Sequence, residues 1–327
     1  MGAQTLQPSG PVVVAGASGT IGRAVAARLL SEGRETVCLL RAPANAAPPL
    51  SLPELAGARI EQVELDDRDA LMRLFGALRP AAVISCIASR SGGPRDAWKV
   101  DHDANCAMLA AAEASGAKHF VLLSAICVQK PRLAFQHAKL AFEAKLAASP
   151  IAHTIVRPTA FFKSLSGQVG RVEACKPFLL FGDGELTRCK PISDADCARF
   201  IVDCLTVPDR EGQILPIGGP GPAISLREQG ELLFELAGRE PRFKSVPVAL
   251  FDWASALLSM GERWSQWCSD KAEYARIAKY YATESMLLLD PDTGEYSAQA
   301  TPEFGSDTLR DHYAALLAEH RNAKVCA

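Results

Sequence analysis

The sequence predicts an α/β fold in which a doubly wound parallel sheet precedes a smaller, mostly helical C-terminal region. Three observations predict it: short apolar strand patterns alternate with helical patterns, a glycine-rich turn joins the first strand to the first helix, and the composition becomes helical from Ser225 onward. The 327 residues suffice for one large domain and a smaller second one. We expect the first domain over residues 1–165, with later strands and helices from about 190–220, and the C-terminal region over residues 221–327.

The glycine-rich turn lies within residues 12–22, VVVAGASGTIG, and spaces its glycines as G-x-x-G-x-x-G. Gly16 permits a sharp turn, Gly19 lets the backbone approach a pyrophosphate, and Gly22 lets the helix pack close to the strand. A pyrophosphate would lie against the free N–H groups and the positive dipole end of that helix. The stretch therefore predicts a Rossmann-type dinucleotide site with contacts from Gly16, Ser18, Gly19, Thr20, Ile21 and Gly22.

Arg41 follows the second predicted strand, residues 36–40, at the position where a dinucleotide-binding protein selects its cofactor. An acidic residue there would bond the ribose 2′-OH of NAD and repel the 2′-phosphate of NADP. The positive charge of Arg41 favours NADPH instead. Arg23 is either a second phosphate contact or a solvated helix residue, and the sequence leaves both open.

The next segments place further candidate contacts at the carboxyl edge of the sheet. A third strand is expected over residues 59–65, and Asp66 after it would contact the cofactor and, with Asp67, cap the following helix. Residues 81–88 form a continuous apolar run, which is typical of a strand buried on both faces. Residues 89–95 form a loop that contains Gly and Pro at the carboxyl end of this strand, where ligands of open parallel sheets bind.

The remaining elements continue the alternation and then become helical. Residues 97–114 have helical periodicity, which Gly116 ends. The helix expected over residues 246–267 is strongly apolar. We interpret its apolar surface first as hydrophobic core, second as the wall of a ligand site and third as a membrane contact. We expect further strands over residues 119–124, 154–156, 178–181 and 213–217, and further helices over residues 198–205, 226–237, 246–267 and 272–282.

The bulk composition excludes several classes of function. The formal net charge is −2, so no basic excess is available to grip a nucleic acid backbone. The ten cysteines include no Cys-x-x-Cys pair, which argues against a zinc or iron–sulfur site, and we expect them to be reduced and mostly buried. No apolar run approaches the roughly 20 residues of a membrane span, and residues 1–10 lack a signal peptide pattern.

Residues 135–139, FQHAK, resemble the segment that carries the Tyr-x-x-x-Lys pair of short-chain dehydrogenase/reductases on one helix face. The G-x-x-G-x-x-G spacing likewise resembles the extended and atypical members of that family. The resemblance implies that Lys139 holds the nicotinamide ribose. It also implies that Ser124 takes the place of the serine that hydrogen-bonds the substrate oxygen.

Phe135 stands where those reductases have the tyrosine that acts as acid or base. Three explanations are open. Catalysis has been lost and the chain only binds a nucleotide, or the acid lies elsewhere, at His137 or Tyr280, or the substrate has no carbonyl oxygen to protonate. Reduction of a carbon–carbon double bond fits the third explanation.

Longer stretches resemble one group of atypical, NmrA-like short-chain reductases. They cover most of the chain from about Val12 to Leu317 and comprise residues 135–143, 156–165, 189–193, 215–221 and 280–287. The group is the NADPH-dependent 3,8-divinyl (proto)chlorophyllide a 8-vinyl reductases of chlorophyll and bacteriochlorophyll synthesis. The resemblance implies hydride transfer from NADPH that converts an 8-vinyl group to ethyl.

The same resemblance assigns partners and site residues. The substrate would be a tetrapyrrole, either divinyl chlorophyllide or protochlorophyllide. Residues 221–327 and aromatic side chains would hold this substrate. A peripheral contact of the protein with a membrane is compatible with this assignment. Compared with plant members the sequence lacks an N-terminal transit extension, so we expect a bacterial, cytoplasmic protein. The implied residues are Lys139 and Ser124 for catalysis, Lys139 and Pro158 for the cofactor, and Phe135, Phe161, Phe162 and Trp253 for the substrate.

Two alternatives remain beside this assignment. A catalytically silent, NADP-sensing regulator of the NmrA-like kind would share the glycine loop and lack the tyrosine. A reductase of a small conjugated, phenylpropanoid-like substrate would also need no phenolic acid. The long C-terminal resemblance argues against both.

Overall fold

The computed structural model describes residues 10–41, 52–259 and 265–325. The chain groups into two compact units. The first unit comprises residues 1–157 and 197–215, and the second unit comprises residues 158–196 and 216–327.

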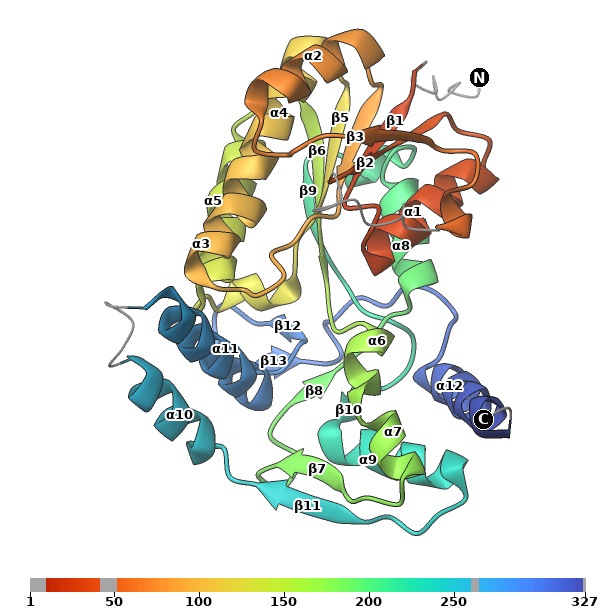
Figure 1. Cartoon of the computed structure of the whole chain (residues 1–327), viewed down its shortest axis with the longest axis vertical. Helices are drawn as coiled ribbons and strands as arrows, with labels where there is room; N and C mark the ends of the chain where they lie inside the picture. The colour runs from red at the N-terminus through yellow and green to blue at the C-terminus, as the bar shows by residue number, and fades with distance from the viewer. Residues whose placement is uncertain (1–9, 42–51, 260–264, 326–327) are drawn as a thin grey trace. The chain divides into compact units, whose positions relative to one another are not determined.

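A seven-stranded sheet forms the centre of the first unit, in the order β3-β2-β1-β4-β5-β6-β9 (Figure 1). The neighbouring pairs among its first six strands are parallel. Because β1 lies between β2 and β4, the strand order reverses beside it, as the doubly wound prediction requires. The strands are β1 Val12–Ala15, β2 Thr36–Leu40, β3 Arg59–Gln62, β4 Ala82–Ser85, β5 His119–Leu123, β6 Ala152–Pro158 and β9 Gln213–Ile217.

Helices cover both faces of this sheet (Figure 1). All residues of β1 and β4 are buried, and both strands are apolar except for Ser85, whose hydroxyl donates to Oδ1 of Asn105 at 2.6 Å. The hydrophobic core between the sheet and α2, α4 and α5 includes Phe120 of β5 and Phe142 of α5, whose ring centroids are 5.9 Å apart. The helices are α1 Thr20–Ser31, α2 Arg68–Leu78, α4 Asn105–Ser115, α5 Ala134–Ala147 and α8 Asp194–Asp203, with shorter turns at η1 Pro53–Leu55, η3 Ile126–Gln129 and η5 Pro208–Arg210.

The prediction of one regular helix over residues 97–114 is wrong in one respect, because a π-helical segment interrupts the α-helix. The chain forms α3 Pro94–Ala97, then the π-helix η2 Trp98–Ala104, and then α4. The Asn105 side chain donates to the carbonyl oxygens of Asp101 (3.0 Å) and Val100 (3.4 Å), and so satisfies carbonyl groups within the wider turns. Hydrophobic periodicity does not reveal this hydrogen-bonding pattern.

Two further boundaries differ from the sequence prediction. The third and fourth strands end at Gln62 and Ser85, so the residues after them form loops at the carboxyl edge. Asp67 alone caps α2, where its side chain accepts from the Ala70 N–H at 2.9 Å. The expectation that Asp66 shares the cap is therefore wrong, and its carboxylate is available for other contacts.

The second unit combines short strand pairs with helices. Its core packs Phe178 and Phe234 against Tyr313, which is fully buried and donates its hydroxyl to the Leu165 carbonyl at 2.9 Å. The helices are α6 Phe162–Leu165, α7 Val169–Glu173, α9 Leu226–Ala237, α10 Ala249–Ser259, α11 Gln266–Thr283 and α12 Leu309–Val325, with the turn η4 Ser166–Gln168. The strands are β7 Phe178–Phe181, β8 Arg188–Cys189, β10 Ile224–Ser225, β11 Phe243–Val246, β12 Leu288–Leu289 and β13 Tyr296–Ser297.

The single apolar helix expected over residues 246–267 is also wrong. Residues 243–246 instead form β11, which pairs in parallel with β7, and α10 begins after Pro247. A second helix, α11, begins at Gln266, and residues 260–264 lie outside the described residues. Within the described ranges no helix has the length and apolar character needed to cross a membrane.

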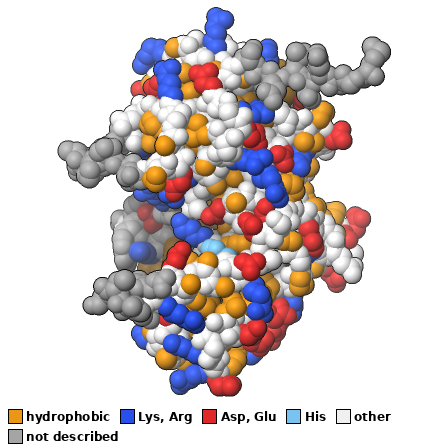
Figure 2. All heavy atoms as spheres, turned by 90° about the vertical axis from the view of Figure 1, so that its right-hand side faces the viewer, with side chains coloured by type: hydrophobic (Ala, Val, Ile, Leu, Met, Phe, Trp, Pro, Cys, Tyr) orange, Lys and Arg blue, Asp and Glu red, His pale blue; other side chains and the backbone are white. Residues whose placement is uncertain are grey.

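Surface charges of both signs are interspersed. On the face shown in Figure 2, Lys and Arg side chains lie among Asp and Glu side chains. This distribution agrees with the formal net charge of −2.

The N-terminal cap of α9 gives a test of local stability. Ser225 accepts from the Glu228 N–H at 3.2 Å, and the Glu228 carboxylate accepts from the Ser225 N–H at 2.7 Å. Ser225→Ala should lower the free energy of unfolding by about 1 kcal/mol in urea denaturation, because a helix N–H loses its acceptor. The exposed Ser164 serves as control, and an equal effect of Ser164→Ala would contradict the assignment.

Candidate active site

The glycine-rich loop joins β1 to α1 at the carboxyl edge of the sheet, beside the point where the strand order reverses. Gly16 has φ +86°, and a Cβ there would lie 2.7 Å from the carbonyl oxygen of Cys86. A Cβ at Gly22 would lie 2.2 Å from the carbonyl oxygen of Gly16. Both positions therefore require glycine for close backbone packing. This packing brings the N-terminus of α1 to the loop.

The N-terminus of α1 has features of an anion site. Gly19 occupies its N-cap position without a side-chain cap, and the first turn has no acidic residue. Uncapped N–H groups and the helix dipole together favour a negatively charged group at this end.

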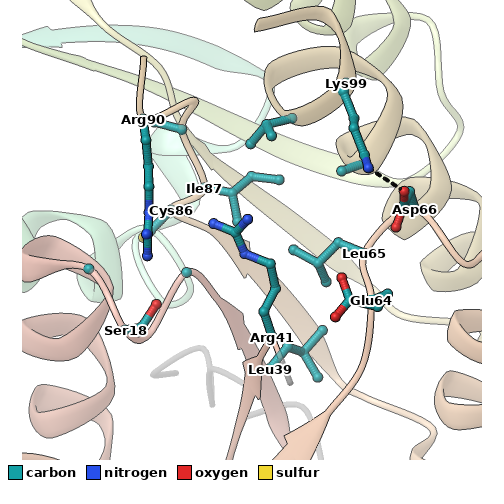
Figure 3. Close-up of a pocket in the computed structure, with 15 residues that line it drawn as sticks. Ser18, Leu39, Arg41, Glu64, Leu65, Asp66, Cys86, Ile87, Arg90 and Lys99 are labelled. Carbon is teal, nitrogen blue, oxygen red and sulfur yellow. Dashed lines mark ion pairs between the residues drawn. The ribbon is translucent and has the colours of Figure 1, made fainter. Parts of the chain in front are cut away.

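A cavity of about 280 Å³ opens beside this loop (Figure 3). It is formed within the first unit by the glycine loop, the ends of β2, β3 and β4, and the π-helix η2. It brings together five of the predicted cofactor contacts: Gly16, Ser18, Gly19, Arg41 and Asp66. Its other lining residues are Leu39, Glu64, Leu65, Cys86, Ile87, Ala88, Arg90, Lys99, Val100 and Ala104.

Other predicted contacts lie outside this lining. Thr20, Ile21 and Gly22 form the first turn of α1, where Ile21 and Gly22 are buried. Pro158 is buried at the end of β6 and belongs to the second unit. Arg23 lies 3.8 Å from Glu54, so its guanidinium has an acidic neighbour on the protein.

The charged groups of the cavity are the cations of Arg41, Arg90 and Lys99 and the carboxylates of Glu64 and Asp66. Lys99 pairs with Asp66 at 2.8 Å, and the hydrogen bond from Lys99 holds the pKa of Asp66 below its ordinary value. Asp66 is therefore an ionised carboxylate whose charge is balanced by its neighbour. Arg41 directs its guanidinium group toward the middle of the cavity, and Arg90 extends along one side toward the glycine loop near Ser18 (Figure 3).

Lys139 is held by a buried ion pair that the sequence analysis missed. Its Nζ lies 2.9 Å from Oδ1 of Asp101, and the two side chains are 9% and 0% exposed. The other carboxylate oxygen of Asp101 accepts from the Ser89 N–H at 3.3 Å. The π-helix η2 carries both Asp101 and the cavity residue Lys99, and this placement could not be read from an ordinary helical pattern.

Ser124 has its hydroxyl proton committed to another buried side chain. It donates to Glu143, one turn after Lys139 on α5, and Glu143 also pairs with Arg157, whose Nε lies 3.2 Å from Oε1. The spacing of four residues from Lys139 was the only signal in the sequence for Glu143. The arrangement joins β5, α5 and β6.

The thiol of Cys86 lies at the edge of the cavity and is not a nucleophile. Burial raises its pKa to about 12, against a smaller lowering effect of the Lys139 charge. A thiol with such a pKa stays protonated at neutral pH, and the thiolate is the reactive form. Cys86 therefore contributes backbone packing rather than chemistry.

The aromatic candidates differ in exposure. Phe135 and Phe161 are half-buried, and Trp253 on α10 is 78% exposed. Phe162 is 4% exposed within the core of the second unit, and its ring lies 5.3 Å from that of His312. Phe162 thus supports the fold of that unit.

The two alternative acids are placed differently. His137 is exposed on α5, one position after the buried Gln136. Tyr280 is 4% exposed on α11, where its ring contacts Tyr281. Neither residue lines the cavity beside the glycine loop.

The cavity fits a phosphorylated dinucleotide. Glycines stand where a Cβ would clash, an uncapped helix N-terminus faces the loop, and two guanidinium groups point inward. Among the described residues, no cluster of three or more His, Cys, Asp or Glu side chains is arranged to hold a metal ion.

Comparison with known proteins supports this assignment. Residues 16–208 match a family model described as NAD(P)H-binding, so the chain has an NAD(P)H-binding domain. Among solved structures, the binary complex of leucoanthocyanidin reductase and NADPH from Vitis vinifera has a TM-score of 0.68 at 17% identity. That match covers 94% of this chain and 100% of the other, and it shows the fold.

Two plant proteins are much more similar in sequence, and both are divinyl chlorophyllide a 8-vinyl-reductases described as chloroplastic. The protein of Cucumis sativus is 46% identical over 319 residues, which covers 94% of this chain and 76% of the relative. The protein of Oryza sativa subsp. indica is 48% identical over 318 residues, which covers 94% and 78%. Their chloroplast location contradicts the expectation of a bacterial, cytoplasmic protein. The chain belongs to the family of divinyl chlorophyllide a 8-vinyl-reductases.

Proposed function

We propose that this chain reduces the 8-vinyl group of a divinyl chlorophyllide or protochlorophyllide to ethyl, with NADPH as the source of hydride. The observation that carries the proposal is the family membership, at 46–48% identity over 94% of the chain for the two relatives described above. The NAD(P)H-binding domain and the cavity beside the glycine loop support it.

The residues of the first unit suit NADPH rather than NADH. Backbone N–H groups at the start of α1 would hold the pyrophosphate, and Arg41 would hold the 2′-phosphate. The carboxylate of Asp66 would otherwise repel that phosphate, but its ion pair with Lys99 balances the charge.

The replacement of tyrosine by Phe135 agrees with this reaction. Reduction of a carbonyl produces an alkoxide, which needs an acid, whereas reduction of a conjugated vinyl group produces a charge that spreads into the macrocycle. No phenol is then required at position 135. Bound NADPH would supply the hydride, and the protein would contribute position and exclusion of water.

Lys139 retains its role without the tyrosine. We propose that its ammonium group holds the nicotinamide ribose and stabilises negative charge on the substrate. Asp101 would orient Lys139 through the buried ion pair. Ser124 would act as a positioning residue, since its proton is donated to Glu143.

A planar tetrapyrrole requires apolar and aromatic surface with few polar anchors. Phe135 and Phe161 are half-buried and Trp253 is exposed, and these three residues are the proposed contacts. Phe162 would support Phe161 from within the core of the second unit rather than contact the substrate.

Incubation of the purified chain with divinyl chlorophyllide and NADPH tests the function. The Soret band should move to shorter wavelength as the vinyl group becomes ethyl. A folded protein that binds NADPH but produces no monovinyl product would contradict the enzyme assignment and favour a silent nucleotide-binding regulator.

The role of Arg41 can be tested by nucleotide binding. Arg41→Ala should weaken NADPH about tenfold to a hundredfold, because a charge-assisted hydrogen bond contributes about 1.5–3 kcal/mol. NADH, which lacks the 2′-phosphate, should change little. Dissociation constants from titration calorimetry give the comparison, and equal weakening of both nucleotides would overturn the assignment.

The role of Lys139 can be tested by steady-state kinetics. Lys139→Ala should lower kcat by roughly 10² or more through lost positioning and electrostatic stabilisation. Phe135→Tyr should change kcat for vinyl reduction little, because this reaction forms no alkoxide that a phenol would protonate.

The Lys139 test needs a control for folding. Lys139→Ala leaves the buried Asp101 carboxylate without its partner, which is destabilising by itself. The double variant Lys139→Ala with Asp101→Asn removes both charges and should remain as slow as the single variant. A full-rate Lys139→Ala enzyme, or recovery of rate in the double variant, would refute the proposed role.

A further inference from the structure

The cavity contains a second guanidinium group besides that of Arg41, namely that of Arg90. Arg90 lines the cavity from the loop after β4, and its side chain extends toward the glycine loop near Ser18 (Figure 3). Among the residues that the structure describes, neither Arg90 nor Arg41 has an acidic partner within ion-pair distance. Unpaired cations that converge on a cavity are suited to an anionic ligand.

The backbone around Arg90 is held in place by the side chain of Asp96. The Oδ2 atom of Asp96 accepts from the N–H of Arg90 (3.0 Å), the N–H of Ser91 (3.1 Å) and the hydroxyl of Ser91 (3.0 Å). A further bond joins the Ser89 N–H to Asp101 at 3.3 Å. The loop therefore presents Arg90 from a fixed backbone, which lowers the entropy lost when the side chain binds.

The position of this loop points to one part of the dinucleotide. The carbonyl group of Cys86 packs against Gly16, so the chain after β4 lies directly against the glycine loop. Arg41, in contrast, follows β2, where the 2′-phosphate is expected. Arg90 thus approaches the anion held by the N-terminus of α1 rather than the phosphate on the ribose.

We propose that Arg90 binds the pyrophosphate of NADPH from the side of β4, while the N-terminus of α1 binds it through backbone N–H groups. This inference rests on the proposed function. It assigns two separate phosphate groups to two arginines: Arg41 distinguishes NADPH from NADH, and Arg90 holds either nucleotide. Asp96 is the positioning residue for Arg90.

Titration calorimetry of the full chain with NADPH and with NADH tests the assignment. Arg90→Ala should weaken both nucleotides by a similar factor of about ten to a hundred, because both carry the pyrophosphate. Arg90→Lys should recover part of the loss, since a lysine keeps the charge but not the forked geometry. Arg95, an exposed arginine on α3 outside the cavity lining, is the matched control, and Arg95→Ala should leave both affinities unchanged.

Two results for Arg90→Ala would overturn the inference. If Arg90→Ala weakens NADPH alone, the side chain binds the 2′-phosphate and not the pyrophosphate. If both affinities stay within twofold of the wild type, Arg90 binds no part of the nucleotide. Failure of the wild type to bind NADPH would instead count against the proposed function. The binding readout therefore separates the two failures without any substrate turnover.

Discussion

The close backbone packing at the end of β1 is the constraint on which the rest of the first unit depends. Gly16 lies against the carbonyl group of Cys86, and Gly22 lies against the carbonyl group of Gly16. These contacts fix how near α1 and the loop after β4 come to the glycine turn. The cavity, the uncapped helix N-terminus and the approach of Arg90 all follow from that arrangement. A side chain larger than hydrogen at either glycine would separate these elements.

Charge balance then gives the site its chemistry. Three acidic groups of the first unit have a cationic neighbour: Asp66 has Lys99, Asp101 has Lys139, and Glu143 has Arg157. Burial of an unpaired charge is costly, so the buried Asp101–Lys139 and Glu143–Arg157 pairs support the fold, whereas the exposed Asp66–Lys99 pair contributes little stability. Arg41 and Arg90 have no acidic partner within ion-pair distance among the described residues, and they are the cations that we propose bind the nucleotide. Lys139 keeps a buried carboxylate partner, Asp101, although Phe135 stands four residues before it.

The π-helix shows where sequence reasoning reached its limit. Apolar periodicity correctly predicted helical structure between Ala97 and Ala114, but it cannot distinguish the wider hydrogen-bonding pattern of Trp98–Ala104. That pattern places Asp101 beside Lys139 and Lys99 beside Asp66. Both partners come from elements distant in the sequence, so neither pair has a local signal. The same limit applies to Ser124, whose partner Glu143 lies 19 residues away.

The sequence by itself determined the elements whose signals are local. The alternation of strands and helices predicted the doubly wound sheet, and the glycine spacing predicted the dinucleotide loop. The position of Arg41 directly after the second strand predicted that this side chain lines the cofactor cavity. Only the tertiary structure decided which candidates are accessible and which are core, as for Phe161 and Phe162. It also introduced Arg90, Asp101 and Glu143, because a side chain's partner depends on which distant elements the fold brings within hydrogen-bond distance.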